Sequence, residues 1–246
     1  MADTQHRRPL TLIHTSDVHL GCEYSGRMAR QALGAVVDAA IDERADVVLL
    51  AGDVFDHNRV SDDEIRFLLG QLSRSGKPSV ILPGNHDCYD AHSVYRRALF
   101  ADRPTNIYVL DDRPESLCLL PELDLEVWGR AVVDHYRGFR PLTEEPPRQE
   151  ADRWRVGLAH GHFELPDATE PRSSPIFPED IASSSCDYIA LGHWDRCADV
   201  SQADVRAFYS GAPHWDGTKR GLAGVLLVTL DPERGAQVVR RPLSPG

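Results

Sequence analysis

The fold is decided by the stretch Asp46-Val47-Val48-Leu49-Leu50-Ala51-Gly52-Asp53-Val54-Phe55-Asp56, an apolar run that ends in a glycine and two carboxylates. The run is apolar enough to form a strand that is covered on both faces. Gly52 allows the chain to turn sharply behind that strand, so that Asp53 and Asp56 follow at its carboxyl end. The stretch therefore predicts a buried parallel strand that delivers oxygen ligands to one edge of a sheet.

The sequence on either side of this strand alternates between strand and helix patterns. Short strands are expected at 10–15 and 78–82. Apolar residues recur with helical spacing over 28–44. Ser61 and the glutamate three residues later are expected to form a capping box that begins a second helix, which Gly76 can end. The order strand-helix-strand-helix-strand predicts parallel pairing with right-handed crossovers.

Beyond residue 101 the pattern changes to shorter strands. Tight turns separate the first three, so we expect antiparallel pairs there, and a proline-rich loop follows at 137–152. The stretch 164–178 is also rich in proline and is expected to be a surface loop. The expected strands are 107–110, 116–120, 123–128, 155–159, 188–191, 205–209, 224–230 and 237–240. We expect one domain over residues 1–246 that contains two sheets.

The composition is that of a soluble folded protein. The 246 residues carry 27 Lys and Arg against 38 Asp and Glu, a net charge of −11. This acidity counts against a protein that grips nucleic acid mainly through a broad basic face. No segment is apolar enough for a membrane helix, and the polar N-terminus is not a secretory signal. The five cysteines lack C-x-x-C spacing and indicate reduced thiols. We therefore expect a cytoplasmic protein.

Histidine, carboxylate and amide side chains follow five of the expected strands, at the point where each strand ends. They are Asp17 and His19, Asp53 and Asp56, Asn85 with His86 and Asp87, His160 and His162, and His193 and Asp195. Each group alone is common in loops, but five groups at strand ends are hard to explain as solvent-exposed turns. Two divalent cations about 3.5–4 Å apart, the arrangement that hydrolyses phosphoesters, need such mixed oxygen and nitrogen ligands. Asp53 can bridge the two ions, and mixed ligands suit Mn²⁺, Fe or Zn²⁺ better than Ca²⁺.

These motifs resemble a known family. Asp17-x-His19, Gly52-Asp53-x-x-Asp56, Gly84-Asn85-His86-Asp87, His160 and Gly192-His193 look like the five ordered motifs of the calcineurin-like metallophosphoesterase superfamily. Residues 12–21, 52–59 and 209–213 resemble the SbcD-type DNA-repair exonuclease branch of that superfamily. The resemblance covers about residues 10–231. It implies an α/β fold, an αββα sandwich of two mixed β-sheets flanked by helices.

The resemblance also implies roles for the motif residues. The first metal would be held by Asp17, His19 and Asp53, and the second by Asp53, Asn85, His160 and His193. His86 would be the catalytic histidine that protonates the leaving oxygen or stabilises the transition state. A water or hydroxide activated by both ions would attack phosphorus in line.

The sequence departs from the family at two places. The last family motif usually reads Gly-His-x-His and its final histidine completes the first metal site, whereas this chain has Asp195 there. Asp195 either ligates the first metal or pairs with Arg196 or a loop. The exonucleases also carry further C-terminal segments and a contact for an ATPase partner, and this chain ends at Gly246. Duplex-end processing with a partner ATPase is therefore in doubt.

Other polar and aromatic residues have two interpretations each. His162 is an alternative ligand to His160. Asn58 and Arg59 are candidates for binding substrate phosphate, although a surface or ion-pair role suits Arg59 equally. Trp194 and Trp215 either stack on a base or pack at the rim of the site.

The function expected is that of a metal-dependent phosphodiesterase acting on nucleic acid or a nucleotide, with two divalent transition metal ions, Mn²⁺ favoured and Fe or Zn²⁺ as alternatives. A phosphatase or small-nucleotide hydrolase is the first alternative function. A binding module without catalysis is the second.

Overall fold

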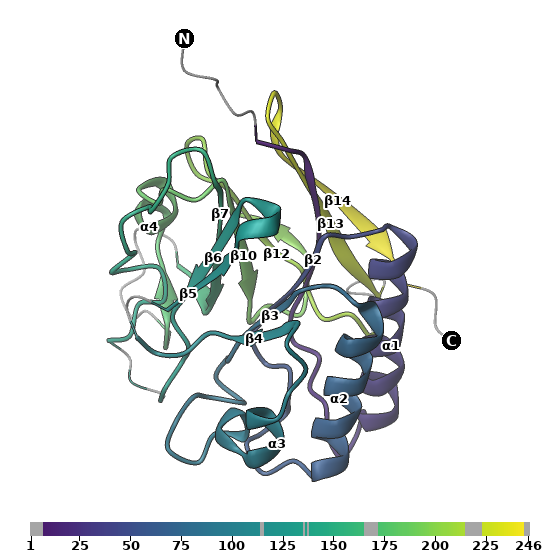
Figure 1. Ribbon diagram of the computed structural model, residues 1–246. Coiled ribbons are helices and arrows are strands. Elements are labelled where there is room, and N and C mark those ends of the chain that lie inside the picture. The colour runs from purple at the N-terminus through teal and green to yellow at the C-terminus, as the bar shows by residue number, and fades with distance from the viewer. Residues whose placement is uncertain are drawn as a thin grey trace.

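Two six-stranded sheets packed face to face form the framework of the protein, as the computed structural model shows (Figure 1). It describes residues 7–113, 116–134, 136, 138–164, 172–214 and 223–243. The strands of the first sheet are β1 (Leu10–Thr15), β2 (Val47–Ala51), β3 (Ser79–Leu82), β4 (Ile107–Val109), β13 (Gly224–Asp231) and β14 (Gly235–Pro242). They lie in the order β14-β13-β1-β2-β3-β4. The strands from β1 to β4 are parallel, while β13 and β14 add an antiparallel edge.

The second sheet is built from the later part of the chain. Its strands are β5 (Leu117–Leu120), β6 (Leu125–Gly129), β7 (Trp154–His160), β10 (Tyr188–Gly192), β11 (Ala198–Asp199) and β12 (Arg206–Tyr209), in the order β11-β12-β10-β7-β6-β5. Both sheets mix parallel and antiparallel pairs, which confirms the predicted αββα sandwich of mixed sheets. β5 and β6 pair antiparallel as expected. The expectation of antiparallel pairing for 107–110 is wrong, because β4 extends the first sheet parallel to β3.

Helices α1 (Gly26–Asp42) and α2 (Asp62–Ser75) cover the outer face of the first sheet (Figure 1). The predicted ends of α2 are confirmed: the Ser61 hydroxyl accepts a hydrogen bond from the Glu64 N–H (3.3 Å), and Gly76 ends the helix with φ of 62°. The Glu64 carboxylate accepts from Arg30 instead of completing the capping box. The shorter helices are α3 (Ala98–Ala101) and α4 (Pro178–Ala182), with 3₁₀ turns η1 (Val94–Arg96) and η2 (Pro121–Leu123).

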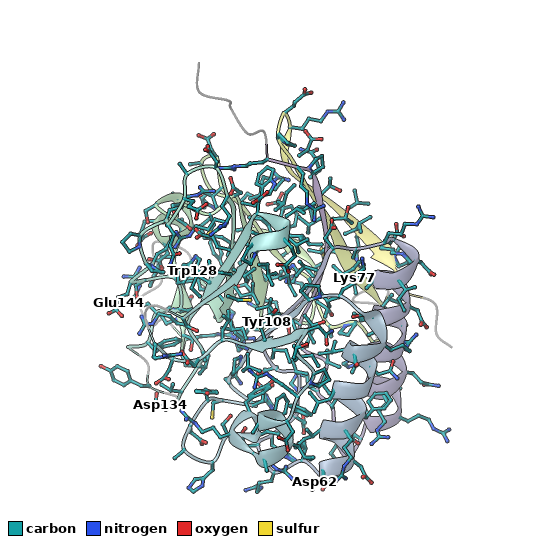
Figure 2. All side chains as sticks on the ribbon, in the orientation of Figure 1. Asp62, Lys77, Tyr108, Trp128, Asp134 and Glu144 are labelled. Carbon is teal, nitrogen blue, oxygen red and sulfur yellow. The ribbon has the colours of Figure 1, made fainter. Side chains whose placement is uncertain are left out.

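Three apolar layers hold these elements together. The interior of the sandwich joins Leu12 and Leu49 of the first sheet to Val127 and Val156 of the second. The outer face of the second sheet is covered by α4 and an irregular segment that includes Leu142. Figure 2 shows Trp128 on the side of the second sheet, Lys77 on the side of the helices and Tyr108 of β4 between them. The second sheet is covered by one helix of 5 residues and irregular chain, whereas helices of 17 and 14 residues cover the first.

A small parallel pair, β8 (His162–Phe163) and β9 (Pro175–Ile176), branches from the end of β7. Within the described part of the stretch 164–178, β9 is an exception to the loop that the prolines predict. Among the described residues, no helix combines the length and apolarity needed to cross a membrane. All five cysteines are free in the structure.

Candidate metal centre

The five strands that carry the predicted ligands end at one edge that the two sheets share. Backbone hydrogen bonds join their turns: the Asp17 N–H donates to the Gly52 carbonyl (3.0 Å) and the His19 N–H to the Asp53 carbonyl (3.1 Å). His160 Nδ1 lies 2.9 Å from the Ala51 carbonyl oxygen, to which its N–H donates. This last bond ties the end of β7 in the second sheet to the end of β2 in the first.

A buried cluster forms where these turns meet. Asp17, Asp53 and His160 each offer one ligand atom, and these atoms lie within 4.8 Å of one another. His160 Nε2 lies 3.2 Å from Asp53 Oδ2 and 3.0 Å from Asn85 Oδ1. His193 Nδ1 lies 3.1 Å from the same Asn85 oxygen. The structure thus brings together all four residues predicted for the second metal.

The chemistry of this cluster fits a bound cation. Because the Nδ1–H of His160 donates to the Ala51 carbonyl, a neutral ring aims the Nε2 lone pair at two oxygens that also carry lone pairs. Only a proton or a metal ion between these atoms satisfies them. Burial opposes a charge on His160, but the Asp53 carboxylate outweighs it and raises the pKa of His160 to about 10. Burial raises the pKa of Asp53, whereas the neighbouring His160 lowers it. The result is a pKa below the usual value of an aspartate.

Three glycines allow this close approach. Gly52 has φ of 91°, and a Cβ there would lie 2.0 Å from His160 Nδ1. A Cβ on Gly84 would lie 2.2 Å from Asp53 Oδ1, and one on Gly192 would lie 1.9 Å from the carbonyl oxygen at the end of β2. Each distance is far below a van der Waals contact. The glycines of the motifs therefore keep the strand ends close enough to share a site.

Four of the predicted ligands have a left-handed backbone. The φ angles of Asp17, His19, Asp53 and His193 are 56°, 53°, 51° and 105°. Residues with side chains adopt positive φ rarely, and such strain gathers at functional sites. The turns after β1, β2 and β10 thus have a strained backbone conformation, and this conformation places the four side chains at the shared edge of the sheets.

A second cluster lies beside the first and is more exposed. His19, Asp56 and His86 each offer a ligand atom within 4.8 Å of the others. His19 Nδ1 lies 3.1 Å from Asp56 Oδ1, and the His86 Nδ1–H donates to the Asp56 backbone carbonyl (2.9 Å). The sequence motif contains Asp56 but does not indicate its role. The structure shows that Asp56 fixes the orientation of both rings, the arrangement that tunes metal-binding histidines.

Asp87 is another residue whose part in the site the sequence does not reveal. It is fully buried and accepts hydrogen bonds from the N–H groups of Val54 (2.9 Å), Phe55 (3.1 Å) and Gly84 (2.7 Å) and from the Tyr95 hydroxyl (2.6 Å). Burial raises the pKa of Asp87. Its carboxyl group joins the turn after β2 to the turn after β3. Its place in the Asn-His-Asp motif is the available signal, but three of its four partners lie outside the turn that carries this motif.

Asp17 is held from two sides. The Ser16 hydroxyl donates to its carboxylate, and Ser16 Oγ lies 2.9 Å from Ser210 Oγ. The His193 N–H lies 3.2 and 3.1 Å from the two Asp17 oxygens. Burial raises the pKa of Asp17 to about 6, against the opposing charge of His160. Asp17 and its neighbour Ser16 together therefore connect the ends of β1, β10 and β12.

The remaining predicted site residues lie outside these clusters. Asp195 is exposed, and its carboxylate belongs to neither cluster. Asn58 uses its amide on the backbone: Nδ2 donates to the Cys88 carbonyl (2.9 Å) and Oδ1 accepts from the Val94 N–H (2.9 Å). Arg59 is exposed and has no ion pair within the described part of the chain. The roles of these three residues stay predictions.

The alternatives for His162 and Trp194 are separated by geometry. His162 Nδ1 accepts a hydrogen bond from Trp194 Nε1 (3.0 Å) and lies outside the buried cluster, so His160 is the favoured ligand. Trp194 stacks on Tyr209 (4.4 Å between centroids, 12°), and the Arg196 guanidinium lies 5.3 Å from its ring. Trp194 thus packs at the rim of the site. Trp215 lies outside the described residues.

Comparisons with known proteins give a family match and several relatives. Residues 10–197 match the family described as calcineurin-like phosphoesterase. The "Uncharacterized metallophosphoesterase YhaO" of Bacillus subtilis is 27% identical over 227 residues, 82% of this chain and 52% of that protein. The SbcD subunit of the nuclease SbcCD from Bacillus subtilis is 26% identical over 245 residues, 83% of this chain and 61% of that protein. The chain therefore spans between one half and two thirds of the length of these relatives.

A solved structure is similar in fold. The protein TT1561 of Thermus thermophilus aligns over 95% of this chain and 99% of its own, with a TM-score of 0.60 at 13% identity. At this sequence identity the similarity shows a shared fold and nothing about function.

Proposed function

The chain belongs to the calcineurin-like phosphoesterase family, whose members hydrolyse phosphoester bonds, and on that premise we propose that it is a metal-dependent phosphodiesterase acting on a nucleotide or nucleic acid. The observation that carries the proposal is the buried contact of His160 Nε2 with the oxygens of Asp53 and Asn85, which only a proton or a metal ion can satisfy. Similarity to a nuclease subunit over 83% of the chain supports a diester as substrate.

The proposed cofactors are two divalent transition metal ions, with Mn²⁺ favoured over Fe and Zn²⁺. The proposed ligands are Asp17, His19 and Asp53 for the first ion and Asp53, Asn85, His160 and His193 for the second. Bound ions supply an activated water and neutralise charge on the phosphate. The free cysteines support a reducing, cytoplasmic compartment as part of the same proposal.

His86 is the proposed proton donor to the leaving oxygen. Its Nδ1–H is held by the Asp56 carbonyl, so Nε2 is the ring nitrogen left for substrate. The side chain is 45% exposed, which leaves it within reach of a substrate at the rim. Its backbone N–H donates to Asp53 Oδ1 (2.8 Å), so the residue is fixed relative to the proposed bridging carboxylate. A histidine in this position is suited to general acid catalysis.

A substrate panel tests the proposal. Mn²⁺-loaded protein is compared on bis-p-nitrophenyl phosphate, p-nitrophenyl phosphate, a cyclic nucleotide and single-stranded DNA. We expect diesters to be turned over at least about tenfold faster than the monoester. Hydrolysis of the monoester alone would show a phosphatase. Two bound ions per chain without turnover of any substrate would show a binding module.

Replacement of His86 tests its role. His86→Ala is expected to lower kcat by about 10²–10⁴-fold while the bound metal stays near the wild-type amount. His92→Ala is the matched control, because His92 is an exposed histidine six residues further along the same connection. Metal content by plasma mass spectrometry accompanies the kinetics. A variant that loses its metal would place His86 among the ligands instead.

A further inference from the structure

His162 lies beside the proposed metal centre but has no role in the proposed hydrolysis. Gly161 turns the chain out of β7, and a Cβ there would lie 2.0 Å from the Ser174 carbonyl oxygen. After this turn the His162 ring stands edge-on to His193, with 5.9 Å between centroids and 84° between planes. His162 is therefore a neighbour of a proposed ligand while being outside the ligand cluster.

The hydrogen bond from Trp194 fixes the tautomer of His162. The indole Nε1–H can only donate, so His162 Nδ1 must carry the lone pair and Nε2 the hydrogen. Trp194 is itself fixed by its stacking on Tyr209, whose hydroxyl donates to the Gly161 carbonyl (2.8 Å). The Nε2–H makes no hydrogen bond within the described residues, and the side chain is partly exposed. The Nε2–H of His162 is therefore an oriented hydrogen-bond donor that lies next to the proposed metal centre and has no partner among the described residues.

A positive charge lies on the same side. Arg172 is exposed, and its guanidinium has no ion pair among the residues that the structure describes. Its segment runs alongside His162: the carbonyl of Ser174, two residues after Arg172, accepts a hydrogen bond from the His162 backbone N–H (3.1 Å), and His162 pairs with Pro175 of β9. The Arg172 backbone N–H donates to the Glu164 carboxylate (2.6 Å). The exposed guanidinium is therefore available to a ligand at the rim.

We propose that His162 and Arg172 form a second phosphate subsite next to His193, which binds the phosphate adjacent to the scissile diester. An imidazole N–H and a guanidinium together offer donors and charge that match phosphate oxygens. Trp194 is a positioning residue that holds His162. This inference depends on the proposed function and narrows its substrate class to nucleotide chains that carry a neighbouring phosphate.

Equilibrium binding tests the subsite without turnover. The ligands are two thymidine dinucleotides with a hydrolysis-resistant phosphorothioate linkage, one with and one without a 5′-phosphate. Calorimetry with the Mn²⁺-loaded protein is expected to show about tenfold tighter binding of the 5′-phosphorylated ligand. This preference falls to about twofold or less in His162→Ala and Arg172→Ala. Arg66→Ala, on the exposed face of α2, serves as the control and keeps the preference.

Two further variants separate positioning from structure. Trp194→Phe keeps an aromatic ring against Tyr209 but loses the N–H, so the phosphate preference weakens and ¹⁵N NMR shows His162 in a mixture of tautomers. His162→Gln restores part of the preference, because its amide can donate from a similar position. A single His162 tautomer in Trp194→Phe would contradict the positioning role.

The outcomes also distinguish this inference from the proposed function. A wild-type preference near one, or a preference unchanged in both His162→Ala and Arg172→Ala, overturns the subsite. Loss of bound Mn²⁺ in His162→Ala overturns it as well, because His162 is then a metal ligand. If no diester is hydrolysed in the substrate panel, the proposed function fails while the binding preference still supports the subsite.

Discussion

One oxygen atom, Asn85 Oδ1, lies between two imidazoles, 3.0 Å from His160 Nε2 and 3.1 Å from His193 Nδ1. The two rings differ in charge: Asp53 raises the pKa of His160 to about 10 against burial, whereas burial and the neighbouring His160 charge lower the pKa of His193 to about 4. A neutral amide can face both rings without adding negative charge. Without metal, the proton on His160 thus supplies the positive charge that the surrounding oxygens need.

Residue 195 decides how well the proposed first metal site is completed. Three ligands are proposed there, and Asp195 is exposed with its carboxylate outside both clusters. Asp195→His introduces the residue type that the family usually has in this motif. We expect first-site Mn²⁺ affinity to rise about tenfold or more, measured by a titration that counts bound ions. Unchanged occupancy and activity in both Asp195→His and Asp195→Ala would show that residue 195 is not a ligand.

Gly52 is predicted to be indispensable. A Cβ at this position would lie 2.0 Å from His160 Nδ1, and φ of 91° is strained for any residue with a side chain. Gly52→Ala should break the hydrogen bond between His160 and Ala51 and destabilise the fold by about 2 kcal/mol or more. Gly34→Ala is the matched control, because nothing lies within 4 Å of a Cβ there. In the interior of α1 it should stabilise by about 0.5–1 kcal/mol. Denaturant unfolding of both variants checks the contrast, and equal stabilities would contradict it.

The residue types of the site can be predicted from the sequence, but some partners cannot. The motifs place Asp17, Asp53 and His160 at strand ends, which is enough to expect their meeting. The end of the strand at residue 159 favours His160 over His162 already in the sequence, and the turn at Gly161 agrees with that choice. The roles of Asp56 and Asp87 depend on contacts with other strands and are invisible in the sequence.

At the scale of elements, β1 carries a buried histidine that couples the two sheets. His14 Nδ1 lies 2.8 Å from the Tyr188 hydroxyl of β10, and burial lowers the pKa of His14 to about 3. Between about pH 3 and 6.5 the unfolded chain binds a proton that the folded protein does not. Stability contributed by neutral His14 is therefore present above about pH 6.5 and is lost as the pH falls through this window.

His14→Gln should remove this pH dependence. In metal-free protein, the slope of the unfolding free energy between pH 4 and 6 should decrease by up to about 1.4 kcal/mol per pH unit, the value for one proton. Urea unfolding at several pH values measures the slope, with exposed His92→Gln as the control. A slope equal to that of the wild type would mean that His14 takes up its proton without unfolding.

The elements themselves can be predicted where their patterns are long. The periodicity of α1 and the caps of α2 locate both helices within about two residues. The sequence predicts the wrong pairing for β4, because its partner is fixed by the space beside β3 and not by its own three residues. The strands β8, β9 and β11 have two residues each and are too short to show any alternation.

At the scale of the whole molecule, the two ends of the described chain lie in one sheet. β1 pairs with β13 on one side and with β2 on the other, and β13 pairs with β14. The first sheet therefore cannot be completed by the N-terminal half alone. The pairing of the first strand with strands from the end of the chain supports our proposal that residues 1–246 form one domain.

The overall charge sets how the protein should hold a nucleic acid. The net charge of −11 becomes −7 when two divalent ions bind, so the surface as a whole still repels phosphates. Attraction must then be local, from the metal ions and from exposed guanidinium groups such as those of Arg59 and Arg172.

A protein with so few phosphate contacts should show weak salt dependence. For single strands the logarithm of the binding constant falls with the logarithm of salt concentration by about 0.7 per phosphate neutralised. Two or three contacts give a slope no steeper than about −2. Fluorescence anisotropy with a labelled phosphorothioate oligothymidine measures this slope in Mn²⁺-loaded and metal-free protein, and binding should weaken strongly without metal. A slope of about −4 or steeper would require phosphate contacts with an extended row of basic side chains. The acidic net charge of this chain does not favour such a row. That result would contradict nucleic-acid binding that depends on the metal centre.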